Sequence, residues 1–186
     1  MKIANLILIC ALLTAAGCAE WNHRVPDNWT KHVATNAHFS VRCPPDWKRI
    51  TGSMAMGDLD LDSPRTTNAA SRNHIWITLV TNREHPEWKS KDDFLGAMRS
   101  AFTSNPPSGR VSFGKLEELS GRTEAGNAWS AFRLVINENN QTNLNIMAVL
   151  ETKNGGLINM LCIAPLDTSS RDERKIFQML NSVKTE

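Results

Sequence analysis

Three strand-like segments separated by short polar turns constrain the second half of this chain to one kind of sheet. Residues 128–136, 144–150 and 157–164 are mostly apolar, as strands of a buried sheet are. The connections at residues 137–141 and 153–156 are rich in Asn and Gly, which tolerate the positive φ that hairpin turns require. Because hairpins join only antiparallel neighbours, the sequence predicts a meander of three antiparallel strands.

Alternating or continuous apolar patterns predict four further strands. They cover residues 39–43, 54–61 with a slip at Gly57, 75–80, and 111–119 with a candidate bulge at Gly114. The segment 75–80 is apolar on both faces. We therefore expect it to lie centrally in a sheet that is covered on both sides.

Two variant capping boxes predict the helices. At residues 90–93 and 169–172 a serine is followed three residues later by an aspartate, and apolar residues at helical spacing come next. Helices should begin within about two residues of Lys91 and of Arg171. The predicted fold class is α+β: an α/β/α sandwich with a largely antiparallel sheet of about six to seven strands, one helix before the fourth strand and a C-terminal helix.

The first 17 residues have the pattern of a secretory signal peptide. Lys2 is followed by the uncharged, apolar residues 3–13, a stretch shorter than the about 20 residues that span a bilayer. Small residues then lead to Cys18, and this pattern resembles the lipobox of bacterial lipoproteins. The resemblance implies cleavage after Gly17 and a diacylglycerol on Cys18 that tethers the protein to a membrane. The alternative is ordinary signal cleavage, with Cys18 an incidental thiol.

The expected organisation is a signal peptide (residues 1–17), a tether (18–36) and one domain (37–186). In lipoproteins the residue after the acylated cysteine directs sorting, and Ala19 is not the aspartate that retains them in the inner membrane. We therefore expect a cell-envelope protein in the outer membrane, facing the periplasm.

Composition argues against a nucleic-acid partner, and the cysteines leave one candidate disulfide. With 41% hydrophobic and 22% charged residues the chain is globular, and a formal charge of +2 offers no basic surplus for nucleic acid. Cys10 leaves with the signal peptide, so Cys43 and Cys162 remain as a candidate disulfide in an oxidising compartment. The alternative is that both are buried and act as small hydrophobic residues.

No motif predicts catalytic, cofactor-binding or metal-binding residues. The five histidines lack metal-ligand spacing, and the serines lie in neither a Gly-x-Ser-x-Gly nor a Ser-x-x-Lys motif. The alternating Asp58, Asp60 and Asp62 begin like a calcium loop, but Ser63 replaces its required glycine. We expect these aspartates to face solvent. Among the tryptophans, Trp88 is a candidate interface anchor, and the alternative is that it covers the helix start.

Four segments, taken in order, resemble the PsbP-like and DcrB-like family: residues 39–47, 91–95, 155–164 and 180–183. This family includes a photosystem II extrinsic subunit, many bacterial lipoproteins and a eukaryotic nuclear-transport factor. The resemblance implies an α/β/α sandwich over about residues 38–184 and a role in binding or scaffolding other proteins. We expect a non-enzymatic protein that binds another protein or envelope component. The alternative is a periplasmic small-ligand-binding protein or a hydrolase.

Overall fold

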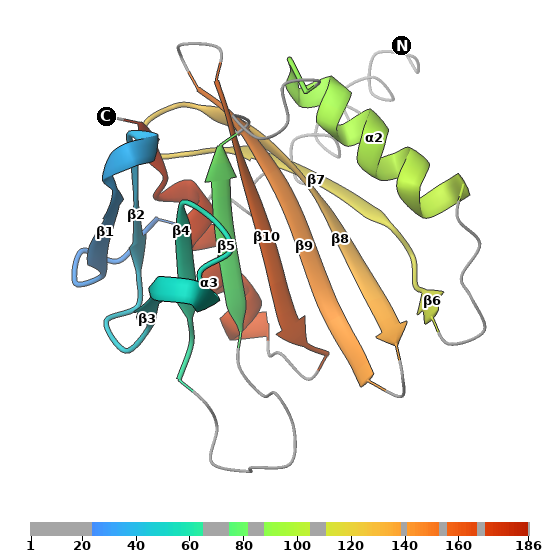
Figure 1. Cartoon of the computed structure of the whole chain (residues 1–186), viewed down its shortest axis with the longest axis horizontal. Coiled ribbons are helices and arrows are strands. Elements are labelled where there is room, and N and C mark those ends of the chain that lie inside the picture. Colours follow the sequence, from blue (N-terminus) through green and yellow to red (C-terminus); the bar gives the residue numbers. More distant parts are fainter. Residues whose placement is uncertain are drawn as a thin grey trace, which may run out of the picture.

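The computed structural model describes residues 24–64, 75–81, 88–104, 111–138, 141–152, 156–166 and 170–185, and a large antiparallel sheet is its centre (Figure 1). Its eight described strands are β3 (Lys48–Ile50), β4 (Leu59–Asp62), β5 (Trp76–Thr81), β6 (Val111–Phe113), β7 (Glu117–Arg122), β8 (Ala128–Glu138), β9 (Gln141–Glu151) and β10 (Leu157–Pro165). Their spatial order is β3-β4-β5-β10-β9-β8-β6, and β7 also pairs with β8.

The predicted meander is confirmed, because β8, β9 and β10 are antiparallel neighbours in chain order. β5 then pairs with β10 and brings the first half of the chain onto the sheet. Two predicted strands differ in detail. Residues 52–54 form the 3-10 helix η2 (Gly52–Met54) ahead of β4, and the segment 111–119 is divided at Gly114 into β6 and β7. The sheet is thus larger than the six to seven strands expected.

A second, three-stranded sheet flanks the first, in the order β1 (Thr30–Ala34), β2 (Phe39–Cys43), β11 (Lys184–Thr185). The 3-10 helix η1 (Thr35–Ala37) connects β1 to β2 and ends at His38, whose φ is 56°. Since β1 lies within the segment 18–36 that was expected to be a tether, that part of the expectation is wrong. Tertiary pairing with β2 forms a strand where the sequence shows no sustained period.

The predicted starts of both helices are confirmed. The expected place of the first helix, before the fourth strand, is wrong, because five described strands, β1 to β5, precede α2, and neither β1 nor β3 was expected. α2 (Lys91–Ser104) begins at Lys91, where Ser90 Oγ accepts a hydrogen bond from Asp93 N (3.2 Å) and Asp93 Oδ2 accepts one from Ser90 N (3.0 Å). This is the reciprocal pattern of a capping box. α3 (Ser170–Asn181) begins one residue before Arg171, while Ser169 lies outside the described residues.

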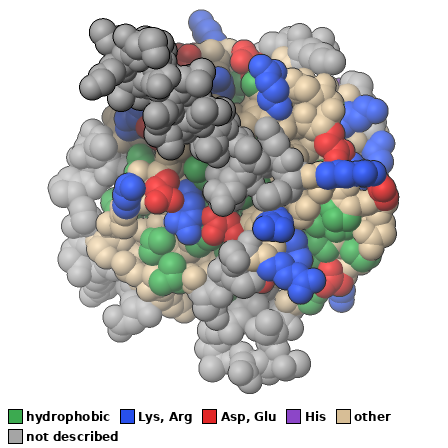
Figure 2. Space-filling model, turned by 180° about the vertical axis from the view of Figure 1, so that it is seen from behind, with side chains coloured by type: hydrophobic (Ala, Val, Ile, Leu, Met, Phe, Trp, Pro, Cys, Tyr) green, Lys and Arg blue, Asp and Glu red, His purple; other side chains and the backbone are tan. Residues whose placement is uncertain are grey.

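The two helices lie on opposite faces of the large sheet. α3 buries its apolar stripe, including Ile176, Phe177 and Leu180, against the sheet. Its outward side carries charged residues, and seen from behind the molecule shows basic and acidic side chains intermixed (Figure 2). α2 lies on the other side and packs Phe94 against Val149 and Leu157. The fold is α+β, with helical cover on each face of the sheet.

The coverage of β5 is less complete than predicted. Ile77 and Leu79 are fully buried on the α3 side, but Trp76, Thr78 and Val80 on the α2 side are only partly buried. β5 therefore lies inside the sheet as expected, but one of its faces is partly open.

Trp129 joins the sheet to α3 through a ring contact and a hydrogen bond. Its indole stacks on Phe177, with ring centroids 5.7 Å apart, and its Nε1–H donates to Asn181 Oδ1 at 2.8 Å. The cross-strand partner on β7 is Gly121, and a Cβ built there would lie 2.4 Å from Trp129 Cζ2. Only a residue without a side chain fits beside this ring.

We expect Gly121→Ala to lower the free energy of unfolding by about 1–3 kcal/mol, because the added methyl group displaces Trp129 from its packing. The matched control is Gly96→Ala in α2, where a Cβ would meet nothing within 4 Å. It should stabilise the protein by about 0.5–1 kcal/mol through helix propensity. Urea unfolding followed by tryptophan fluorescence measures both. Equal stability of the two variants would contradict the role assigned to Gly121.

Candidate functional site

The side of the large sheet that faces α2 is only partly covered. In β10 the alternate residues Leu157, Asn159, Leu161 and Ile163 point to this side, opposite to the buried Met160 and Cys162. Leu157 packs under α2, but Leu161 is 41% and Ile163 is 36% exposed. The apolar strand therefore continues beyond the helix that covers its beginning.

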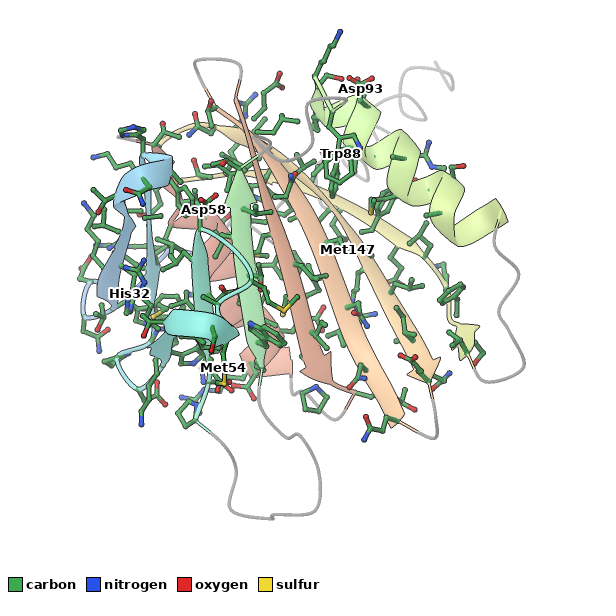
Figure 3. All side chains as sticks on the ribbon, viewed as in Figure 1. His32, Met54, Asp58, Trp88, Asp93 and Met147 are labelled. Carbon is green, nitrogen blue, oxygen red and sulfur yellow. The ribbon has the colours of Figure 1, made fainter. Side chains whose placement is uncertain are left out.

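The neighbouring strands extend this exposed region. Leu161 lies between Met147 on β9 and Thr78 on β5, and Ile163 lies opposite Trp76. Cross-strand partners share a face of the sheet. We call Trp76, Met147, Leu161 and Ile163 the apolar face. Figure 3 shows Met147 on the large sheet and Met54 at η2.

The η2 loop, residues 52–57, carries two more exposed apolar side chains. Met54 is 70% and Met56 is 71% exposed. The loop lies against β5, because a Cβ at Gly57 would come within 2.6 Å of Thr78 Cγ2 and 2.7 Å of Leu79 O. Because Thr78 is the cross-strand partner of Leu161, the η2 loop and its two methionines lie next to the apolar face.

Asp60 holds the η2 loop in this position. Its Oδ2 accepts hydrogen bonds from Met56 N (2.7 Å) and Gly57 N (2.9 Å), and its Oδ1 accepts one from Thr78 Oγ1 (2.5 Å). Its neighbour Asp58 accepts from Thr81 N at 2.8 Å. Asp60 is 1% exposed, so the expectation that these aspartates face solvent is wrong for this one. The backbone N–H groups of the η2 loop satisfy the buried carboxylate of Asp60. The alternation of apolar and polar residues in the sequence does not reveal this arrangement.

Two polar groups on the same side of the sheet lack hydrogen-bond partners among the described residues. They are the indole Nε1–H of Trp76 and the side-chain amide of Asn159, which is 5% exposed. Asn159 lies between Val80 and Val149. Buried polar groups are usually satisfied, so these two mark a surface that is not optimised for stability alone.

A separate cleft of about 410 Å³ lies at the small sheet, lined by Lys31, Ser40, Arg42, Glu124, Ala125, Ser182, Val183 and Lys184. Arg42 forms an ion pair with Glu124 Oε2, and Glu124 Oε1 accepts a hydrogen bond from Val25 N at 3.0 Å. Ser182 Oγ accepts one from Arg42 N at 2.8 Å. The size is that of a small-ligand pocket, and four of the eight lining residues are charged.

The residues singled out from the sequence do not converge on one site. Cys18 lies outside the described residues. Cys43 and Cys162 are free, fully buried thiols, so the candidate disulfide is not formed in this structure. Burial, with a smaller effect of Asp46, raises the pKa of Cys43 to about 12. Burial also raises the pKa of Cys162, followed by the effect of Glu173, and both thiols are therefore unreactive at neutral pH.

Trp88, the candidate interface anchor, packs at the start of α2. Its ring meets Phe94 edge to face, with centroids 5.1 Å apart, and it covers the cluster of Phe94, Val149 and Leu157. The ring is partly buried. This contact corresponds to the alternative in which Trp88 covers the helix start.

Neither metal-binding nor membrane-spanning groups emerge from the described structure. Across the described segments, no cluster of three His, Cys, Asp or Glu side chains is arranged to hold a metal ion. None of the described helices combines the length and apolar character needed to cross a bilayer.

The exposed apolar residues were missed by sequence reasoning. Leu161 and Ile163 belong to a continuous apolar run, and such a run predicts a strand covered on both sides. Met54 and Met56 fall in the segment 54–61, whose pattern predicts a strand, whereas the strand begins only at Leu59. One sequence signal could have revealed the η2 loop. Gly57 interrupts the alternation of apolar and polar residues in the segment 54–61, and in the structure its N–H donates to Asp60.

Comparison with known proteins establishes the fold. No protein-family model matches the chain, and no curated protein sequence matches it. The structure resembles cyanobacterial PsbP (CyanoP) from Synechocystis, with a TM-score of 0.57 and 13% identity over 84% of this chain and 92% of that one. It also resembles the Ran-binding protein Mog1p of Saccharomyces cerevisiae, with a TM-score of 0.51 and 11% identity over 85% and 95%. The structure of a Mog1 variant gives a TM-score of 0.53, with 11% identity over 85% of this chain and 96% of that chain. The chain therefore has a PsbP-like fold.

We expect Asp60→Ala to loosen the η2 loop, because it removes the acceptor of three hydrogen bonds. The free energy of unfolding should fall by about 1–3 kcal/mol. Amide hydrogen exchange at Met56 and Gly57 should accelerate more than exchange in β9. Asp60→Asn is the matched control, since its remaining carbonyl oxygen still accepts from the loop, and it should have a smaller effect. Unchanged exchange at Met56 and Gly57 in Asp60→Ala would show that the loop is held by other contacts.

Proposed function

We propose that this protein is a non-enzymatic, lipid-anchored component of the cell envelope that binds another protein through the apolar face. The observation that carries the proposal is the exposure of Leu161 and Ile163 in an otherwise buried strand, together with the exposed Met54 and Met56 of the η2 loop, which lies against the neighbouring strand β5. Contiguous exposed apolar side chains on a folded domain are typical of binding surfaces.

The composition of this surface suits a protein partner. Burying apolar area against a partner contributes roughly 25 cal/mol per Å², and methionine side chains adapt to an irregular opposing surface. Trp76 can add an aromatic contact and an indole donor at the same place. The hydrogen bonds of Asp60 hold the loop before binding, which reduces the entropy lost on association.

The structural neighbours are consistent with a binding role. Mog1p is described as Ran-binding, and it shares the fold of this chain. One fold hosts many activities, so the argument for binding rests on the apolar face of this chain and not on that neighbour.

The anchor proposal rests on the first residues of the sequence, where the lipobox-like pattern ends at Cys18. Two or three acyl chains on one residue give stable membrane attachment, whereas a single chain gives only marginal binding. Ala19 favours the outer membrane, facing the periplasm. The domain then stands beside the membrane with the apolar face accessible to a periplasmic partner.

We expect Cys18→Ser to abolish lipidation, because the thiol is the acceptor of the diacylglycerol. Metabolic labelling with a fatty-acid analogue should label the wild type and not the variant, and the variant should leave the membrane fraction or remain unprocessed. Thermal unfolding of the variant should match that of the wild type, because residue 18 precedes the described domain. Label on the serine variant, or none on the wild type, would refute the anchor.

We expect a photoreactive amino acid at position 161 to form a reproducible adduct with one envelope protein in intact cells. Ile163→Ser should reduce that adduct severalfold, because it removes part of the apolar contact. Leu166→Ser is the matched control: Leu166 is 49% exposed but follows β10 instead of belonging to the apolar face. Loss of the adduct in Leu166→Ser to the same degree, or no adduct at all, would count against the apolar face.

A further inference from the structure

The methionine side chains of this protein differ widely in their exposure to solvent. Met147, Met160 and Met179 are buried, with 9%, 2% and 0% of their surface exposed. Met54 and Met56 of the η2 loop are 70% and 71% exposed. A methionine side chain is apolar and usually fills gaps in a core, so two exposed thioethers that are two residues apart call for an explanation.

The backbone of the η2 loop keeps both thioethers at the surface. Ala55 N donates to Gly52 O at 3.1 Å and closes the 3-10 turn, and Met56 N donates to the buried carboxylate of Asp60. The loop lies directly on the large sheet, because a Cβ at Gly57 would come within 2.7 Å of a backbone oxygen of β5. The two methionine side chains therefore cannot enter the core unless the loop leaves the sheet.

The cysteine sulfur atoms of the domain are protected from oxidation. Cys43 and Cys162 are fully buried, and burial raises the pKa of both thiols, so that little reactive thiolate is present at neutral pH. A thioether carries no proton and needs no deprotonation before it reacts. A two-electron oxidant that approaches the folded domain from solvent therefore meets the thioethers of Met54 and Met56 before these thiols.

We propose that Met54 and Met56 form a reversible oxidation site that controls binding at the apolar face. A peroxide transfers one oxygen atom to the thioether: an S–O bond forms, the O–O bond breaks, the sulfur loses two electrons and the peroxide is reduced to water. A reductase that consumes two thiols returns the sulfoxide to the thioether, with one disulfide and one water as products. The inference rests on the proposed function, because oxidation of this loop affects binding only where a partner covers it.

Oxidation changes the polarity of this surface without changing the core. Neither Met54 nor Met56 belongs to a buried cluster of the described structure, so the fold does not depend on their packing. A sulfoxide converts the flexible apolar side chain into a polar one. Its oxygen is an acceptor that loses its water without gaining a donor when an apolar partner surface covers it, which is unfavourable. The partner should therefore be released from a domain that stays folded.

The test uses envelopes isolated from cells that produce the full chain with the photoreactive amino acid at position 161. Hydrogen peroxide is added before irradiation, and mass spectrometry of peptides gives the oxidation rate of each methionine. Met54 and Met56 should be oxidised at least about tenfold faster than Met147, Met160 and Met179. The adduct yield should fall roughly tenfold. The thermal unfolding temperature of the purified protein should not change on oxidation.

Two double variants separate this site from other targets of peroxide. Met54→Leu with Met56→Leu removes both thioethers and keeps the apolar character, so peroxide should leave its adduct yield unchanged relative to its own untreated sample. Met54→Gln with Met56→Gln carries amide oxygens in place of sulfoxides and should give a low yield without peroxide. The two epimer-specific methionine sulfoxide reductases, added with a dithiol, should restore the yield of the oxidised wild type.

An unchanged adduct yield with Met54 and Met56 fully oxidised would overturn the oxidation site and leave the apolar face standing. An equal loss of adduct in the leucine double variant would do the same, because the sensitive group would then lie elsewhere. A lower unfolding temperature after oxidation would also overturn it, since the two side chains would then support the fold. Absence of any adduct from untreated envelopes would overturn both the partner surface and its control by oxidation.

Discussion

The contact of Trp129 with α3 is the interaction on which the rest of the structure depends. The ring lies between Gly121 on β7 and Phe177 on α3, and its Nε1–H bonds to Asn181. The backbone carbonyl of Asn181 accepts a second hydrogen bond, from Glu124 N at 2.8 Å. One buried residue at the end of α3 therefore ties the sheet to the turn that carries Glu124. The residues after Asn181 then continue into Ser182 and β11, which complete the open edge of β2.

Both candidate surfaces follow from the period of the strands. A strand alternates its side chains between two faces, so β10 cannot bury Cys162 without turning Leu161 and Ile163 to the opposite side. The same rule turns Lys31 and Arg42 outward when Val41 and Cys43 enter the core. A slip of one residue would reverse both outcomes, and it is opposed because it would expose the buried Val41, Cys43 and Cys162.

Local patterns predicted the elements that local interactions stabilise. The capping box at residues 90–93 located the start of α2, and the short turns between 128 and 164 gave the meander. Elements that depend on distant partners were missed. β1 is a strand because β2 pairs with it, and β11 has two residues whose partners lie in β2. The burial of Asp60 likewise depends on Thr78, on another strand.

The same reasoning explains why neither candidate surface was visible in the sequence. Leu161 is exposed because α2 covers only the start of β10, and the extent of that cover depends on how Phe94 meets Val149 and Leu157. Lys31 and Arg42 of the cleft lie on consecutive strands, but Lys184 comes from the last strand and joins them only through strand order. The cleft lies at the small sheet, which flanks the large one (Figure 1), whereas the apolar face lies on β5, β9 and β10 of the large sheet. The two surfaces are therefore separate, and the proposed protein partner needs only the apolar face.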